Sequence, residues 1–164
     1  MTVEEQIRDL TSNIREFSGY MNSLPENLFL KKLDDWAPRD ILAHLIGWNR
    51  STIEGCQEIM ASRVPLYFID PGHDFSKFNA ILVQEYNSKD RVRLIEELEV
   101  STQELELFLL SIDPADWEAD YGVTYKGGSV TVRNTVEALN IDYVKHRRQV
   151  QKWAESQHID SSNV

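Results

Sequence analysis

The residue types and spacing best suited to chemistry lie late in the chain, where Asp142 and His146 are four positions apart. On a helix, side chains at i and i+4 lie one turn apart on the same face. A carboxylate oxygen and an imidazole nitrogen placed in this way can bind one divalent metal ion together. Thr135, Gln149 and Trp153 fall on the same strip by helical angle, so this face surrounds the pair with polar and aromatic groups.

A third candidate ligand, His44, lies in the segment WAPRDILAHLIGW, residues 36–48. Pro38 suits the first helical position because proline has no N–H to lose there. Asp40 complements the positive end of the helix dipole. The segment therefore predicts a helix that begins near Ala37, with Asp34 or Asp35 as candidate caps, and that places His44 among apolar neighbours.

Small residues recur beside His44, since Gly47, Ser51 and Gly55 occupy every fourth position. Two interpretations of this face are open. This segment alone favours the first interpretation, in which the small residues allow another helix to pack closely against a buried core histidine. The alternative is that the small residues leave room for a ligand above the imidazole.

Four amphipathic helices are expected to position these groups, near residues 3–23, 38–62, 89–111 and 130–156, because each carries an apolar stripe. The sequence thus predicts an all-α four-helix bundle. Residues 1–158 are expected to form a single domain, and residues 159–164 a frayed tail. His73 and His158 are expected to be exposed to solvent and not to act as ligands. Residues 114–129 predict a loop with some extended backbone and no stable hairpin.

A long crossover, residues 64–87, separates the second and third of these helices and carries the aromatic residues Tyr67, Phe68, Phe75 and Phe78. Within it, residues 74–86 predict a short helix capped by Asp74. A connection of this length is either a cap over the core or a lid over a pocket.

Composition limits the function classes. The 17 basic and 27 acidic residues give a net charge of −10, which argues against nucleic acid as a partner because a phosphate backbone requires a positive face. No run of about 18 apolar residues predicts a membrane span. Cys56 is the single cysteine, so intrachain disulfides are excluded and a cytoplasmic location is expected.

Three segments together resemble the DinB-like four-helix bundle superfamily, and most of all its ClbS/DfsB branch: WAPRDILAHLIGW, FNAILVQEY at residues 78–86 and NIDYVKHRRQVQKW at residues 140–153. The resemblance implies an up-down-down-up bundle, often dimeric, so a homodimer is expected. It also implies a divalent metal held by one histidine of the second helix and two histidines four apart on the fourth. His44 and His146 match this pattern, but Asp142 replaces the third histidine.

Two histidines and one carboxylate can bind zinc, nickel, manganese or ferrous iron. The alternative is a relative that has lost its metal, with Asp142 and His146 left as an exposed pair. Because some superfamily members are thiol-dependent transferases or isomerases, and the ClbS type is linked to protection against a reactive small molecule, a metal-dependent hydrolase or transferase is expected. The alternatives are a module that binds or sequesters a small-molecule ligand and a metal-free structural homodimer.

A pocket is expected beside the candidate ligands. Asn79 is placed over its mouth by the resemblance, where its carboxamide could orient a ligand or a water molecule; the alternative is an exposed polar residue on a short helix. The expected pocket residues are Trp36, Trp48, Ser51, Phe78, Asn79, Thr135, Gln149 and Trp153.

Overall fold

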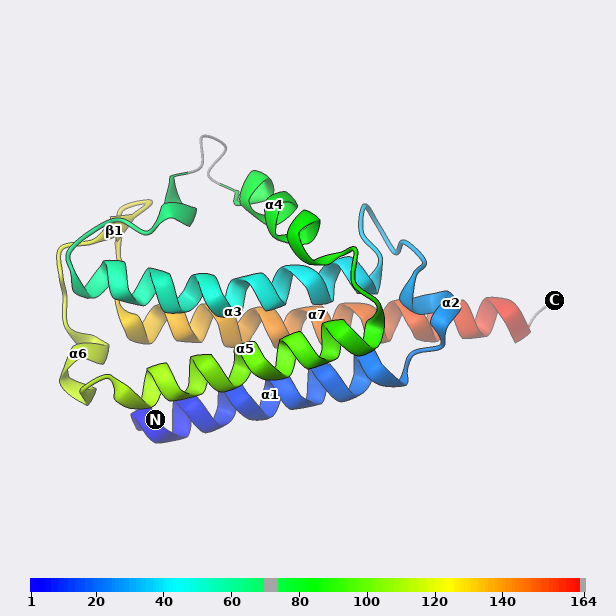
Figure 1. Cartoon of the computed structure of the whole chain (residues 1–164), viewed down its shortest axis with the longest axis horizontal. Coiled ribbons are helices and arrows are strands. Elements are labelled where there is room, and N and C mark those ends of the chain that lie inside the picture. The colour runs from blue at the N-terminus through cyan, green and yellow to red at the C-terminus, as the bar shows by residue number, and fades with distance from the viewer. Residues whose placement is uncertain (70–73, 163–164) are drawn as a thin grey trace.

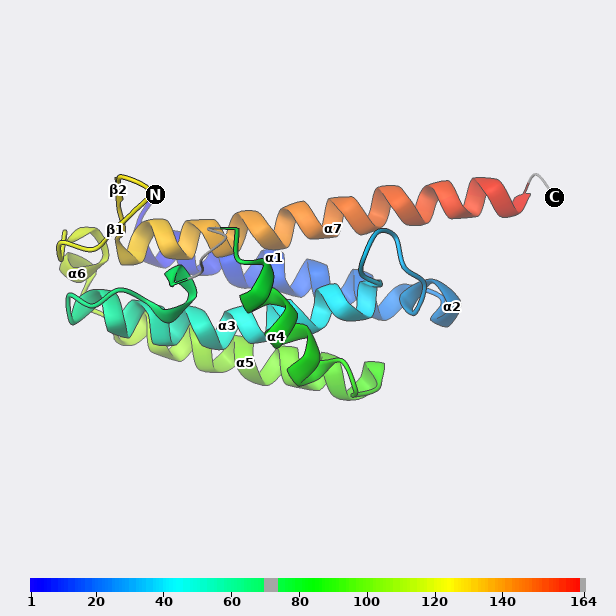
Figure 2. The ribbon, with the colours of Figure 1, turned by 90° about the horizontal axis from the view of Figure 1, so that it is seen from above.

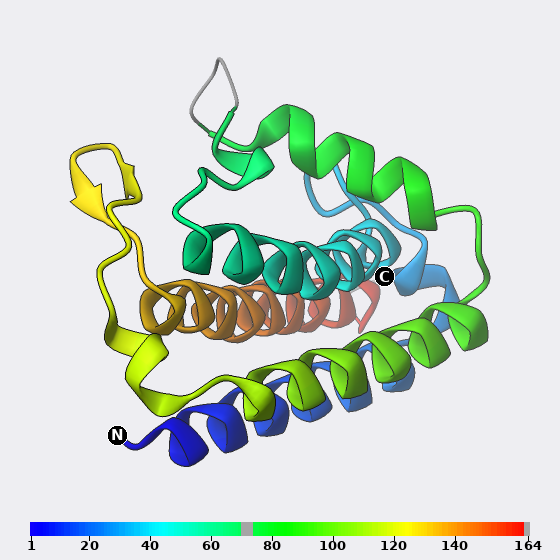
Figure 3. The same cartoon turned by 60° about the vertical axis from the view of Figure 1, so that its left-hand side comes forward.

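The computed structural model describes residues 1–69 and 74–162. Four long helices dominate it: α1 (Val3–Ser23), α3 (Pro38–Met60), α5 (Arg91–Ser111) and α7 (Val132–Ser162). Figure 1 shows α1 and α7 running in one direction and α3 and α5 in the opposite direction. The helices α1 and α3 each pack against both α5 and α7, so the four form a closed ring (Figure 3).

Shorter elements occupy the connections: α2 (Glu26–Phe29), η1 (Leu66–Phe68), α4 (Ser76–Tyr86), α6 (Pro114–Glu118), β1 (Thr124–Tyr125) and β2 (Gly128–Ser129). The sequence did not predict α2 or α6. In the described residues the only sheet is this antiparallel pair, with Tyr125 opposite Gly128. The predicted all-α class is therefore confirmed, and the predicted loop at residues 114–129 contains α6 and, as its extended backbone, this pair of two-residue strands. Lys126 and Gly127 both adopt positive φ, which is the turn that closes a two-residue hairpin.

Helix ends differ from the predictions where the sequence offers more than one cap. At the start of α3, the Asp40 carboxylate accepts a hydrogen bond of 2.9 Å from the Ala37 amide, so neither predicted aspartate caps it. At α5 the cap is Asp90, which accepts from the Arg93 amide. The last helix continues past the predicted end at residue 156, to Ser162, so most of the predicted tail is helical.

The bundle core is filled by the apolar stripes of the four long helices and by Trp117 of α6, which is fully buried. The Phe17 and Tyr143 rings meet edge to face at the centre, 5.4 Å apart. Burial of such large side chains is the main stabilising contribution to the fold. In the described residues, no helix is long and apolar enough to cross a membrane.

A buried polar network ties three of the helices together inside this core. The Tyr143 hydroxyl group of α7 donates a hydrogen bond of 2.7 Å to the Asn49 Oδ1 atom of α3. The Asn49 amide nitrogen in turn donates to the hydroxyl groups of Ser101 and Thr102 on α5, at 3.0 and 3.3 Å. All four side chains are buried, and such groups are stable in a core only when they are hydrogen-bonded.

The helix α4 lies across α3 (Figure 2). At Gly47 the two helices approach so closely that an added Cβ atom would lie 2.7 Å from Leu82 Cδ2. At Gly55 an added Cβ atom would lie 2.6 Å from Tyr67 Cε1. The small-residue face is therefore occupied by Leu82 of a neighbouring helix and by the ring of Tyr67, as the close-packing interpretation expected.

Candidate metal site and adjoining pocket

Three predicted ligand residues come together between α3 and α7. One ligand atom of each of His44, Asp142 and His146 lies within 4.8 Å of the other two. His44 is buried, while Asp142 and His146 are half-buried. The i and i+4 spacing places the latter pair on one face of α7, and the ring of α1, α5, α3 and α7 brings that face against α3. In the described residues, this is the one group of three such side chains that could hold a metal ion.

The His44 imidazole has a fixed orientation. Its Nδ1 atom lies 2.7 Å from the Ile41 carbonyl oxygen, and because a carbonyl only accepts, Nδ1 carries the proton. The neutral ring therefore leaves the lone pair of Nε2 free for a ligand. Burial, helped by the nearby His146, lowers the pKa of His44 to about 3. The hydrogen bond with Ile41 opposes this shift but is the smallest of the three effects. The ring is thus neutral at physiological pH, which is the form that binds metals.

His146 is oriented by a relay that leads out to solvent. Gln149 Nε2 donates to the Asp34 carboxylate at 3.2 Å, and a carboxylate only accepts, so the Gln149 oxygen must face the imidazole. That oxygen lies 2.9 Å from His146 Nδ1, which therefore donates to it. As at His44, Nε2 is left with the lone pair. Metal-binding histidines are commonly oriented in this way by a hydrogen bond at the second nitrogen.

The donor set fits a divalent ion of the transition series. Two imidazole nitrogens and a carboxylate oxygen are ligands that zinc, nickel, manganese and ferrous iron accept. Ligand atoms at about 2.1 Å from a tetrahedral ion lie about 3.5 Å apart. Atoms within 4.8 Å of one another would therefore need to approach by about 1 Å to bind one ion.

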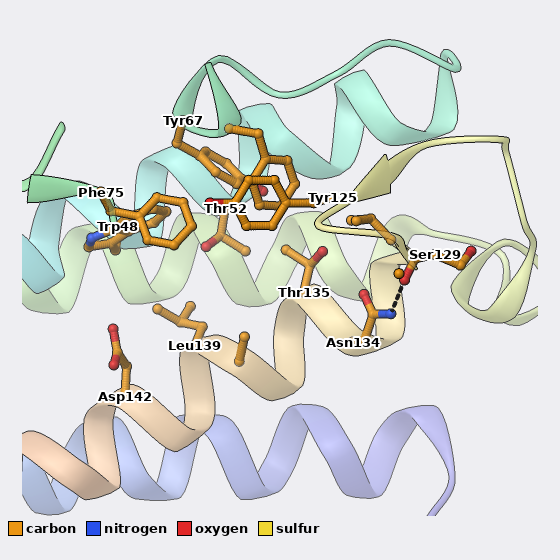
Figure 4. Close-up of a pocket in the computed structure, with 14 residues that line it drawn as sticks. Trp48, Thr52, Tyr67, Phe75, Tyr125, Ser129, Asn134, Thr135, Leu139 and Asp142 are labelled. Atoms are coloured by element: carbon orange, nitrogen blue, oxygen red, sulfur yellow. Dashed lines mark hydrogen bonds between the residues drawn. The ribbon is translucent and has the colours of Figure 1, made fainter. Parts of the chain in front are cut away.

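A pocket of about 420 Å³ adjoins this cluster, and Asp142 belongs to both. Figure 4 shows Asp142 and Leu139 of α7 below the cavity and the rings of Tyr67, Phe75 and Tyr125 above it. The remaining lining residues are Trp48, Thr52, Phe68, Gly128, Ser129, Val130, Asn134, Thr135 and Ala138. A cavity of this volume is within the range of small-molecule sites.

The aromatic side of the pocket is one continuous cluster. The Trp48 ring lies 5.0 Å from that of Tyr67 and 5.8 Å from that of Phe75. Phe68 and Tyr125 are stacked, with 4.2 Å between their centroids and 19° between their planes. These contacts join α3, the crossover and the hairpin into a single wall.

One hydroxyl group of this wall is sealed inside it. Tyr67 is 6% exposed, and burial raises the pKa of its phenol. Its hydroxyl group contacts Thr135 and lies against α3 at Gly55, where an added Cβ atom would overlap it. Solvent does not reach this oxygen, so a molecule in the cavity would meet the ring of Tyr67 and not its hydroxyl group.

The predicted pocket residues divide into three groups. Trp48 and Thr135 line the cavity. Trp36 and Gln149 contact the ligand histidines instead: the Trp36 ring lies 4.9 Å from that of His44, and Gln149 binds His146. The remaining four do not line the cavity: Ser51, Phe78, Asn79 and Trp153.

Phe78 and Asn79 support the wall from α4, because both contact Trp48: Phe78 through its ring at 5.1 Å and Asn79 through a hydrogen bond. Ser51 is buried on α3, and the half-buried Trp153 packs on the core. His73 lies outside the described residues, as does the side chain of His158.

Sequence reasoning missed several lining residues as site members, among them Thr52, Phe75, Tyr125 and Asn134. The aromatic content of the crossover signalled a lid, but Tyr125 lies in a hairpin about 50 residues later, and no periodic pattern links the two. Thr52 of α3 is buried, at 2% exposed, and it also borders the cavity.

The bundle with its long crossover has the same fold as solved DinB-like proteins. Among solved structures, the chain is similar to DfsB, the sibling lethal factor precursor, with a TM-score of 0.78 and 12% identity over 96% of this chain and 97% of that one. It is also similar to the colibactin self-resistance protein ClbS, solved in complex with double-stranded DNA, with a TM-score of 0.75 and 14% identity over 94% and 96%.

A third similar structure is the mycothiol-dependent maleylpyruvate isomerase, with a TM-score of 0.73 and 14% identity over 92% of this chain. The chain spans only 61% of the length of that enzyme. The sequence matches no family model and no curated protein. Identities this low show the fold alone, and at that level the resemblance to the ClbS/DfsB branch is confirmed.

Proposed function

We propose that the protein is a divalent-metal-dependent hydrolase or transferase that acts on a small reactive molecule held in the adjoining pocket. One observation supports this above all: His44, Asp142 and His146 converge beside a cavity that Asp142 also lines. A molecule in the cavity would lie next to the cluster. Convergent polar groups beside a pocket of this size are a common mark of a functional site.

A divalent ion with open coordination positions lowers the pKa of a bound water molecule or thiol and so supplies a nucleophile near neutral pH. The chain's own residues have separate tasks. The two Nε2 atoms and the Asp142 carboxylate would hold the ion, and Gln149 would keep His146 in its orientation. The aromatic wall would exclude water from the ligand.

Metal analysis of protein purified without chelator or affinity tag tests the site. We expect about one equivalent of a divalent transition metal, and saturable uptake of Co²⁺ with the visible spectrum of a nitrogen and oxygen site. His146→Ala and Asp142→Asn should abolish uptake at micromolar metal and leave the helical circular dichroism unchanged. Glu137→Gln, an exposed change on the same helix, is the matched control. A wild-type protein that binds no divalent ion would overturn the proposal.

A second candidate function is supported by the pocket alone: a module that binds and sequesters an apolar small molecule without converting it. The aromatic wall favours retention of an apolar ligand, with or without an ion. Mass spectrometry of the recovered ligand distinguishes the two functions. Recovery of the ligand unchanged from metal-loaded protein supports the module, and a shifted mass supports the enzyme.

We further propose that residues 1–158 are one up-down-down-up bundle domain and that the protein acts as a homodimer in the cytoplasm. The helix directions in Figure 1 support the first point, the resemblance supports the second, and the single buried cysteine supports the third. Light scattering should give twice the chain mass of 19.0 kDa. A measured mass equal to that of one chain at high protein concentration would contradict the dimer.

Nucleic acid is not among the proposed partners, although ClbS was solved with double-stranded DNA. The net charge of −10 opposes binding to a phosphate backbone. A mobility-shift assay with double-stranded DNA at physiological salt should therefore show no complex. A complex that persists there would overturn this exclusion.

A further inference from the structure

The charges around the pocket restrict what it can hold. Its lining includes no lysine, arginine or histidine among the described residues, and its floor carries the Asp142 carboxylate. The nearby Lys126 ammonium group lies over the Tyr125 ring, 5.4 Å from its centroid, and Lys126 is not a lining residue. An anionic group in the cavity would lose its hydration without gaining a basic partner. The ligand therefore carries no negative charge where it contacts the pocket walls.

The arrangement of the walls indicates a flat ligand. Aromatic rings stand on one side of the cavity, and Thr135, Leu139 and Asp142 of α7 stand on the other (Figure 4). Five of the 14 lining residues are aromatic. A planar ring system placed between these walls could meet the aromatic side chains in offset or edge-to-face contacts, which are the favoured geometries.

We propose that the pocket binds a molecule that carries no negative charge and has a flat aromatic portion, which lies along the ring wall. This inference deepens the proposed function. It rests on that function only in taking the bound molecule to be the substrate. Binding itself requires no metal, because the aromatic wall and Tyr67 lie outside the ligand cluster.

The test uses the full chain kept in chelator, so that its outcome is independent of metal uptake. Calorimetric titration compares 2-naphthalenemethanol with 2-naphthoate, which shares the ring system but carries a negative charge. We expect the alcohol to bind about tenfold more tightly or better. Equal or tighter binding of naphthoate would overturn the charge argument, and no binding of the alcohol up to about 1 mM would overturn the pocket.

Two variants locate the binding. Ala138→Trp fills the cavity from an exposed position and should abolish binding of the alcohol, whereas Ile141→Trp, an exposed non-lining change on the same helix, should not. Wild-type affinity in Ala138→Trp would overturn the assignment. If protein kept without chelator fails to take up a divalent metal, that result would count against the metal site and not against the ligand pocket.

Discussion

The indole nitrogen of Trp48 donates a hydrogen bond of 2.7 Å to the carboxamide oxygen of Asn79. This bond joins a pocket residue on α3 to the short helix α4, which otherwise packs on α3 through apolar contacts such as that of Leu82 with Gly47. Asn79 therefore influences the pocket by holding its wall. The sequence left two roles open for Asn79, orienting a ligand or lying exposed on a short helix. In the structure Asn79 contacts Trp48 and does not line the cavity.

Replacement of Asn79 by alanine should lower the free energy of unfolding by about 1 kcal/mol, because the half-buried Trp48 N–H would lose its acceptor. Urea unfolding monitored by tryptophan fluorescence measures this change. Gln84→Ala, at an exposed position of the same helix, should have almost no effect. Equal stability of Asn79→Ala and wild type would show that the bond contributes nothing to the position of α4.

Gly55→Ala should destabilise the protein by about 1–3 kcal/mol, because the new methyl group would overlap the Tyr67 ring and force it out of the wall. Gly19→Ala is the matched control, since an added Cβ atom there meets nothing within 4 Å. It should instead stabilise α1 by up to about 1 kcal/mol through helix propensity. Thermal unfolding of both variants provides the comparison, and stabilisation by Gly55→Ala would contradict the observed contact.

Gln149→Leu should weaken metal binding by about 10- to 100-fold while leaving every metal ligand in place, because the oxygen that orients His146 would be lost. Competition against a chromogenic chelator measures the affinity. Gln151→Leu, exposed on the same helix, should bind like wild type. If both variants keep wild-type affinity, the relay from Asp34 through Gln149 does not orient His146.

Burial raises the pKa of the Cys56 thiol to about 12, from an ordinary value of 9.0. Between these values the unfolded chain releases a proton that the folded chain retains, so the free energy of unfolding falls as the pH rises above about 9. The loss at pH 10 should be about 1 kcal/mol. Cys56→Ala should lack this contribution, and unfolding of the two proteins at pH 8 and pH 10 isolates it. Parallel losses in both would contradict a buried, protonated thiol.

The fold was largely predictable because local signals agree with the tertiary structure. Pro38 marked the start of α3 correctly, and the apolar stripe of α1 gave both of its ends. The prediction was wrong where signals compete or are missing. The third helix was predicted from about residue 89, but its cap is Asp90 and α5 begins at Arg91. No proline or glycine follows residue 156, so nothing in the sequence marks where α7 ends.

The candidate site was predictable in its ligands but less so in its walls. The spacing of Asp142 and His146 follows from helix geometry alone, and the resemblance paired them with His44. Tyr125 and Phe75 lie in irregular segments whose positions depend on tertiary contacts, such as the stacking of Phe68 on Tyr125. No local periodicity carries that information.

The buried hydrogen bond between Tyr143 and Asn49 sets the lengthwise alignment of α7 against α3. Tyr143 is the neighbour of Asp142, and Asn49 follows His44 by little more than one turn. A slip of α7 by one turn would carry His146 about 5.4 Å along the bundle and would leave both buried polar groups without partners. The core therefore fixes the distance between the two ligand-bearing helix faces, so a change of ligand type, such as aspartate in place of histidine at residue 142, leaves the spacing of the site intact.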